Sequence, residues 1–295
     1  MNEFKTYHPI VNLIYFIAVI GFSMFFLNPI CLIISLICSI SYSIMLGGRK
    51  AIKFNILYML PLLIFSALLN PTFNHQGVTI LAYFPSGNPL TLESLLYGAA
   101  TACMLVSTIS WFSCFNKIMT SDKLMYLFGK LLPAFSLIFS MVLRFVPKFK
   151  VQMKNVSNAQ ACIGRDVSAG SPLIRAKNGI KILSAMVSWS LENAIETADS
   201  MKSRGYGLPK RTAFSNYIFS KRDMKAFVFI TMFTICILIG NSLGIISFNY
   251  YPALEFAKIS YESIFIYIVY FALCITPIVI ESWEAYKWKL LKSKI

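Results

Sequence analysis

The chain has 295 residues, of which 57% are hydrophobic and 13% are charged, and its net charge is +15. Average soluble proteins carry about 25% charged residues. Several stretches here run for about 17–25 residues without a charge, which is the length that crosses a hydrocarbon core of about 30 Å. This composition excludes a soluble globular protein. It predicts an all-α, polytopic membrane protein, in which Lys and Arg mark the cytoplasmic loops.

Apolar runs separated by turn residues or charges predict six transmembrane helices. Asn28-Pro29 divides the first long run, and Gly47-Gly48-Arg49-Lys50 ends its second half. The segment 131–147 is apolar enough to enter the membrane, but it contains Arg144 and two prolines. A crossing there would move the following basic stretch outside, so we expect none. The expected spans are 10–27, 30–46, 54–69, 92–115, 226–246 and 261–282.

The distribution of charge predicts the topology. The basic segments are expected in the cytoplasm, and two connections with little positive charge, 70–91 and 247–260, are expected outside. With six spans, both termini are cytoplasmic in a multi-pass protein of the cell membrane (inner or plasma membrane). We expect a four-span N-terminal bundle, a cytoplasmic helical arm and a C-terminal pair of helices with a basic tail, at 1–115, 116–225 and 226–295.

The stretch 144–225 holds fifteen Lys and Arg residues against five Asp and Glu residues. Helical patterns occur at about 148–163 and 173–203, and apolar residues such as Val187 and Trp189 are interleaved with the basic ones. A nucleic-acid-binding tail would lack this apolar face, so no nucleic-acid partner is expected. The arm could lie on anionic lipid of the bilayer, form a docking platform for a soluble partner, or only set the topology.

Both helical patterns of the arm end with an Arg beside a Gly, as Gly164-Arg165-Asp166 and as Ser203-Arg204-Gly205. Gly after the last turn is a common helix stop, and Arg there complements the helix dipole. That structural explanation is sufficient for one such ending. Two of them, about 40 residues apart on a basic arm, indicate a pair of tips that contact a partner.

The ordered set of motifs resembles the transmembrane T component of energy-coupling factor (ECF) transporters, the CbiQ/EcfT family. The segment Ser203–Gly207 resembles the signature of that family. Similar stretches cover roughly residues 10 to 245. In the family the first tip is usually Ala-Arg-Gly, whereas this chain has Gly164-Arg165-Asp166. The other matching stretches are Asn70–His75 with Gly77–Thr79, Met141–Pro147, and Arg211–Ser215 followed by Lys221–Asp223.

This resemblance implies a coupling subunit of an ECF-type ABC importer. Two ATP-binding subunits, as a homodimer or a heterodimer, would hold the two tips, and a membrane-embedded S component would bind the substrate and pack on the apolar side of the arm. The cargo would be a vitamin or a transition-metal ion such as cobalt, chosen by the S component. The residues expected to dock on the ATPases are Arg165, Arg204, Gly164, Gly205, Asp166 and Ser203.

Other functions are disfavoured by what the spans and loops lack. The chain has no phosphate-binding loop of the ATPase type, so it is not expected to be an enzyme, and partner ATPases would supply the energy. Its two histidines, His8 and His75, are far apart and no cysteine cluster accompanies them, so no metal or cofactor is expected. A stand-alone secondary transporter or a membrane scaffold remains the alternative, although the spans contain almost no ionisable groups for coupling.

Overall fold

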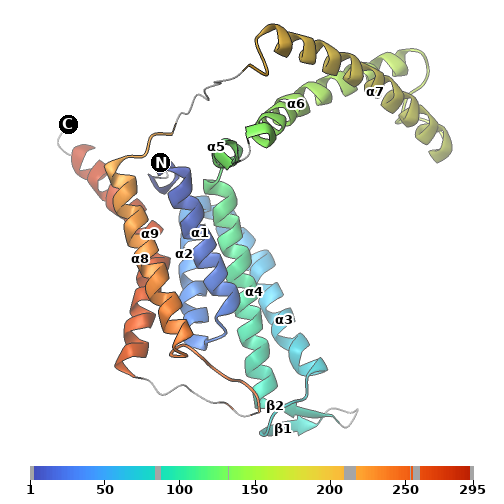
Figure 1. Ribbon diagram of the computed structural model, residues 1–295. Helices are drawn as coiled ribbons and strands as arrows, with labels where there is room; N and C mark the ends of the chain where they lie inside the picture. Colours follow the sequence, from blue (N-terminus) through green and yellow to red (C-terminus); the bar gives the residue numbers. More distant parts are fainter. Residues whose placement is uncertain are drawn as a thin grey trace. The chain divides into compact units, whose positions relative to one another are not determined.

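The computed structural model describes residues 3–83, 88–131, 133–208, 217–252, 254 and 260–292. The chain divides into two compact units. We call residues 1–124 and 217–295 the membrane unit and residues 125–216 the arm unit. Both are built of helices, which confirms the all-α class (Figure 1). The stretch Arg211–Ser215, which resembles the family, lies outside the described residues.

The membrane unit contains a short 3-10 turn, six α-helices and a π-helical turn. The arm unit contains two long helices, and helix α5 spans the boundary between the units. The membrane-unit elements are η1 (Glu3–Thr6), α1 (Pro9–Phe25), α2 (Pro29–Phe54), η2 (Asn55–Met59), α3 (Leu60–Phe73), α4 (Leu92–Ile118), α8 (Lys221–Ser242) and α9 (Tyr261–Lys292). The others are α5 (Ser121–Leu131), α6 (Pro133–Cys162) and α7 (Pro172–Ser203).

The apolar helices of the membrane unit agree with membrane insertion. Among the described residues, four stretches are long and apolar enough to cross a bilayer: α2 through α3, α4, α8 and α9. Helix α1 is apolar and 17 residues long. Within α2 the backbone of Gly48 has φ +54° and ψ −140°, which only glycine adopts readily, so the helix is interrupted where a loop was expected. The count of six spans stays a prediction.

Local sequence explains where several of these helices begin. Asn28 precedes Pro29, and its side-chain oxygen accepts from the backbone N–H of Ile30 at 3.0 Å. Proline fits the first turn because its missing N–H would be unpaired there. Helix α8 begins with a capping box, in which Ser220 and Asp223 each accept from the backbone N–H of the other.

The core of the membrane unit is aromatic. Trp111 of α4 is fully buried, and its indole N–H donates to the Ser35 hydroxyl of α2 at 3.0 Å. Tyr15 of α1 packs edge-on to Trp111 and donates to the carbonyl of Cys274 in α9 at 3.2 Å. These bonds satisfy polar atoms that would otherwise be costly in an apolar interior. They tie α1, α2, α4 and α9 into one unit.

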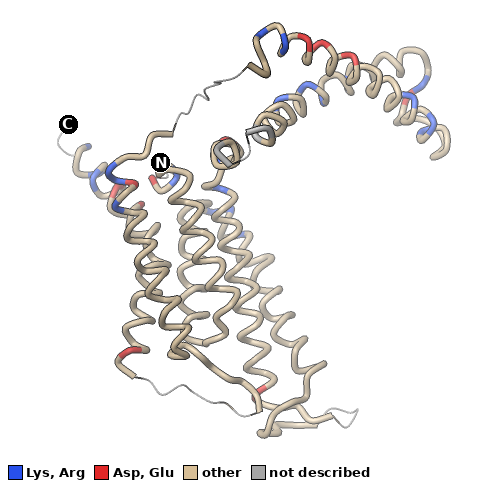
Figure 2. Tube along the Cα trace, viewed as in Figure 1, with Lys and Arg blue, Asp and Glu red and all other residues tan. Residues whose placement is uncertain are grey.

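Charge separates the two ends of the membrane unit. In Figure 2 the Lys and Arg residues of this unit gather at the end where α8 begins and α9 ends. The acidic Glu93 and Glu262 lie in the first turns of α4 and α9, at the opposite end. This distribution is the one that the positive-inside rule associates with a cytoplasmic and an external face.

One local expectation differs from the structure, and two connections contain elements that were not predicted. The segments 131–147 and 148–163 form the single helix α6, with Pro147 inside it, so the boundary expected near Pro147 is wrong. Pro147 removes one intrahelical hydrogen bond and its ring crowds the preceding turn, yet the helix continues past it. The polar connection 117–130 contains helix α5, and the connection 70–91 contains a two-stranded antiparallel hairpin, β1 (Ile80–Tyr83) with β2 (Pro89–Thr91).

Candidate functional site

The first tip is the C-terminal end of α6. The N–H of Gly164 donates to the carbonyl of Ala161 at 3.0 Å, and the N–H of Arg165 donates to the carbonyl of Gln160 at 2.9 Å. This pair of bonds is the Schellman motif, in which a left-handed residue after the helix satisfies its last carbonyls. Gly164 has φ +75°, so glycine is required there. The Arg165 side chain is exposed.

The second tip, at the C-terminal end of α7, has the same backbone geometry. The N–H of Gly205 donates to the carbonyl of Lys202, and the N–H of Tyr206 donates to the carbonyl of Met201, both at 3.0 Å. Gly205 has φ +79°. Arg204 caps the helix and is exposed. The two sequence-predicted tips are therefore the same kind of helix end.

The two arginines occupy different positions of that shared motif. Arg204 immediately precedes its glycine and belongs to the helix cap, whereas Arg165 follows its glycine. The residue that matches Arg204 at the first tip is Ile163, which is 61% exposed. The order Gly-Arg in place of Arg-Gly thus moves the first guanidinium two backbone positions away from the helix and leaves an apolar side chain in its place.

The backbone motif alone is not specific to these tips. Helix α8 of the membrane unit ends in the same way, because the N–H of Gly244 donates to Asn241 and the N–H of Ile245 donates to Gly240. Gly244 has φ +74° but no arginine beside it. What distinguishes the arm is the combination of this helix end with an exposed guanidinium.

Asp166 organises the loop of the first tip from within. Its carboxylate accepts from the backbone N–H of Ser168 at 2.9 Å and from the Ser168 hydroxyl at 2.5 Å. These bonds hold the pKa of the Asp166 carboxyl below its usual range, with the Ser168 hydroxyl as the largest cause. The Asn178 side chain donates to the Asp166 carbonyl at 3.1 Å, and the Arg175 guanidinium donates to the Val167 carbonyl at 2.8 Å. The loop is thereby tied to the start of α7.

Ser203 contributes to its own helix, since its hydroxyl donates to the carbonyl of Ser200 at 2.9 Å. Of the six sequence-predicted residues, Arg165 and Arg204 present exposed charges. Gly164 and Gly205 end the helices, and Asp166 and Ser203 form local hydrogen bonds. The structure therefore divides the predicted set into charged side chains that can reach a partner and residues that shape the tips.

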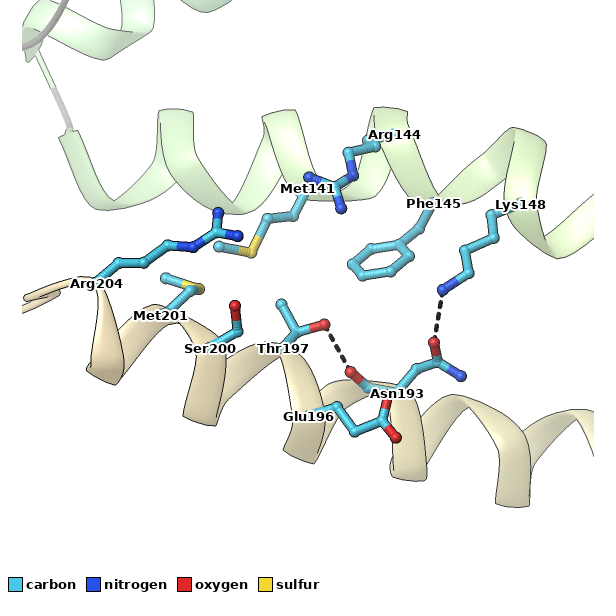
Figure 3. Close-up of a pocket in the computed structure, with 10 residues that line it drawn as sticks. All are labelled: Met141, Arg144, Phe145, Lys148, Asn193, Glu196, Thr197, Ser200, Met201 and Arg204. Carbon is cyan, nitrogen blue, oxygen red and sulfur yellow. Dashed lines mark hydrogen bonds between the residues drawn. The ribbon is translucent and has the colours of Figure 1, made fainter.

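A groove of about 280 Å³ between α6 and α7 extends the second tip. Figure 3 shows the side chains of Arg144 and Arg204 turned into the space between the two helices. Lys148 donates to the side-chain oxygen of Asn193 at 2.6 Å, and its ammonium lies 5.3 Å from the Trp189 ring centre. The groove is lined by Met141, Arg144, Phe145, Lys148, Asn193, Glu196, Thr197, Ser200, Met201 and Arg204.

Within the described part of the arm, the two arginines of this groove form no ion pair. Among the residues that the structure describes, no salt bridge joins Arg144 or Arg204 to a carboxylate, although Glu196 also lines the groove. Arg144 and Lys148 are not among the six sequence-predicted site residues. Their spacing of four places them on one face of α6, and Ser200 and Arg204 have the same spacing on α7, which was the available signal.

A second surface of the arm is apolar. Helix α7 exposes large apolar side chains that recur every three or four residues, which places them on one face. Each is more than half exposed: Ile180, Leu183, Val187, Leu191 and Ile195. Helix α6 exposes a similar series, Phe135, Phe139, Val142 and Val146. Exposing apolar helix faces of this size to water is unfavourable. The apolar faces of α6 and α7 therefore mark surfaces that contact lipid or protein.

Comparison with known proteins decides the family. A family model described as cobalt transport protein (CbiQ) matches residues 4–214, which include both tips. The chain belongs to the CbiQ/EcfT family. The CbiQ/EcfT match extends from η1 through the arm and ends before α8.

Individual relatives of this CbiQ/EcfT chain are similar over shorter stretches. The energy-coupling factor transporter transmembrane protein EcfT of Leuconostoc gelidum is 33% identical over 101 residues, which cover 34% of this chain and 38% of that protein. The EcfT protein of Lactobacillus helveticus is 38% identical over 90 residues, 30% of this chain and 32% of that protein. The EcfT protein of Lactococcus lactis is 31% identical over 109 residues, 37% and 41% of the two chains.

The aligned parts therefore span about a third of the length of these curated relatives. Membership in a membrane-protein family agrees with the long apolar helices of the membrane unit. The expected family and the all-α membrane fold are thus confirmed. The roles of Arg165, Arg204 and their neighbours remain predictions. The geometry of the tips separates the charged side chains from the residues that shape the helix ends.

Proposed function

We propose that this chain is the transmembrane coupling subunit of an ECF-type ABC importer. It would transmit ATP-driven motion of two ATP-binding subunits to a membrane-embedded S component that carries a vitamin or a transition-metal ion. The observation that supports this most strongly is the pair of exposed arginines, Arg165 and Arg204, at two helix ends of the same geometry within the family match.

The chemistry of the tips suits docking on acidic grooves. A guanidinium presents a planar fork that pairs with a carboxylate through two parallel hydrogen bonds. Neither Arg165 nor Arg204 forms a salt bridge within the described part of the chain, so both retain their donors for a partner. The glycine beside each arginine turns the backbone away without adding a side chain to the contact.

The apolar face of α7 suits the second partner. Leu183, Val187 and Leu191 follow one another at helical spacing and are each more than half exposed. An S component embedded in the membrane would cover such a face with apolar side chains of its own. This assigns opposite chemistries to the two partners, with charge at the tips for the ATPases and an apolar helix face for the S component.

Orientation and energy supply follow from the same proposal. The end of the membrane unit that carries its Lys and Arg residues would face the cytoplasm, with both termini. The chain itself would hydrolyse nothing, and the paired ATPases would supply the free energy. The S component would select the cargo, so the proposal leaves the choice between a vitamin and a metal ion to that partner.

Co-purification tests this function. The tagged chain is expressed with ECF-type ATPases encoded in its own genome, and the material retained after gentle solubilisation is compared with that of the double variant R165E/R204E. We expect two ATPases with the unaltered chain and none with the double variant. A matched control, K150E/K154E, reverses two exposed charges of α6 at least ten residues before Arg165 and should retain both ATPases.

Two outcomes would contradict the proposal. Equal retention by the unaltered chain and by R165E/R204E would place the docking surface elsewhere on the arm. If the unaltered chain retains no ATPase under conditions that preserve a known complex of this type, the stand-alone transporter becomes the better hypothesis.

A further inference from the structure

The chain passes between its two units at two points, which we call the arm roots. One is the start of α5, residues 121–124, and the other is the segment 217–223, which leads into α8. Both roots belong to the membrane unit, and both contact the N-terminal segment 3–8.

At the α5 root, a buried lysine makes the contact with segment 3–8. Lys123 is 3% exposed, and its ammonium donates to the carbonyls of Lys5 at 2.5 Å and Tyr7 at 3.3 Å. With the Asn12 amide oriented to satisfy its neighbours, its oxygen accepts from Lys123 at 2.7 Å. Burial, and then the charge of Lys5, lower the pKa of Lys123 to about 8, while the charge of Asp223 in α8 acts in the opposite direction. The buried Lys123 ammonium is therefore bound by oxygen acceptors of segment 3–8 and of α1.

On the α8 side, the contacts come from two adjacent residues. The N–H of His8 donates to the carboxylate of Asp223 at 3.1 Å, and Asp223 is 3% exposed. Arg222 donates to the hydroxyl of Thr6 at 2.9 Å, lies 3.9 Å from the Glu3 carboxylate and covers the ring of Tyr7 at 4.3 Å.

Aromatic contacts complete this side. The His8 ring packs edge-on against Phe219 with ring centres 5.0 Å apart, and against Tyr217 at 6.5 Å. The segment 3–8 thus contacts the incoming chain at three successive places, namely residues 217, 219 and 222–223.

We infer that residues 3–8 form a clasp that joins the two roots of the arm, and that Lys123, Arg222 and Asp223 are positioning residues for it. A helix cap or a local turn would serve only its own element. Here each strong contact spans more than a hundred residues of sequence, and the two sets meet on six consecutive residues. The clasp therefore transfers strain at one root to the other.

Under the proposed function, this inference has a mechanical consequence. A stroke delivered at the tips would reach the membrane unit through two roots that are held together, rather than through two independent joints. The clasp itself does not depend on that function, because all its contacts lie within the membrane unit.

Hydrogen–deuterium exchange of the full chain in lipid nanodiscs tests the clasp. Lys123→Met removes the hydrogen bonds between α5 and segment 3–8. Arg222→Gln removes the guanidinium contacts between α8 and segment 3–8. We expect each variant to speed exchange about five- to tenfold at both roots, in peptides covering 121–131 and 217–225. The informative result is the remote one, which is faster exchange of 217–225 in Lys123→Met and of 121–131 in Arg222→Gln.

The matched control is Lys221→Gln, which removes an exposed charge from the first turn of the same helix without touching segment 3–8. It should leave both roots unchanged. The inference is overturned if each variant loosens only its own root, or if Lys221→Gln acts like Arg222→Gln. Failure of the ATPase co-purification would refute the proposed function but would leave these exchange results, and hence the clasp, unaffected.

Discussion

Replacing Arg204 by Ala is expected to weaken binding of the partner ATPases roughly 30- to 1,000-fold, which corresponds to about 2–4 kcal/mol. Arg204 caps α7, so its backbone is fixed by the last helical turn. Its side chain lies along the groove beside Met141 and Met201, which limits its conformations before binding (Figure 3). A preorganised arginine at a protein interface loses little entropy on docking and is a typical hot spot.

Replacing Arg165 by Ala should have a smaller effect, roughly threefold to tenfold. Arg165 lies two motif positions further from its helix than Arg204 does, and it does not line the groove between α6 and α7. More of its conformational entropy must therefore be lost on docking. At this tip the exposed Ile163 takes the position before the glycine, so Ile163→Asp should weaken binding more than Arg165→Ala.

The measurement is the dissociation constant of the detergent-solubilised chain for the purified ATPase pair, at one fixed salt concentration. Lys202→Ala serves as the control, because it removes an exposed cation two residues before Arg204. Equal losses for Arg204→Ala and Arg165→Ala would contradict the asymmetry that the two helix ends predict.

Replacing Asp223 by Ala is expected to lower the free energy of unfolding by about 2–4 kcal/mol, because buried donors lose a charged acceptor. The carboxylate accepts from the Ser220 N–H at 3.0 Å, the Ser220 hydroxyl at 2.6 Å and the His8 N–H at 3.1 Å. The substitution therefore removes the capping box of α8 and the hydrogen bond to the N-terminal segment together.

A thermal unfolding scan measures this effect, and the midpoint should fall by about 3–6 °C. Asp223→Asn should lie between the unaltered chain and Asp223→Ala, because the amide oxygen still accepts while the charge is lost. Asp199→Ala, which removes an exposed carboxylate of α7, should shift the midpoint very little. A shift for Asp223→Ala no larger than that of Asp199→Ala would show that the buried carboxylate contributes little.

Local patterns of the sequence predicted much of this structure. Uncharged apolar runs locate the helices of the membrane unit, and Gly164 and Gly205 locate the ends of α6 and α7. These features depend on residues that are close in sequence, namely a helix stop, a turn or a run of fixed length. The same local logic failed at Pro147, where the rest of the helix outweighs the hydrogen bond that proline removes.

The clasp could not be predicted in this way. Lys123 lies in a basic segment that resembles any cytoplasmic loop, and nothing near it in the sequence indicates that it is buried against Lys5 and Tyr7. Its partners are more than a hundred residues away. The groove beside Arg204 had a weak signal in the spacing of Arg144 and Lys148, but only the packing of α6 against α7 brings those cations together with it.

The distance between the two tips tests the central claim most directly. Spin labels on Ile163→Cys and Ser203→Cys, both at exposed positions, report this distance by pulsed electron paramagnetic resonance once the native cysteines have been replaced. In the assembled complex, a non-hydrolysable ATP analogue should shift the distance distribution relative to the nucleotide-free state, and R165E/R204E should abolish the shift. Identical distributions with and without nucleotide would contradict transmission of the ATPase stroke through these tips.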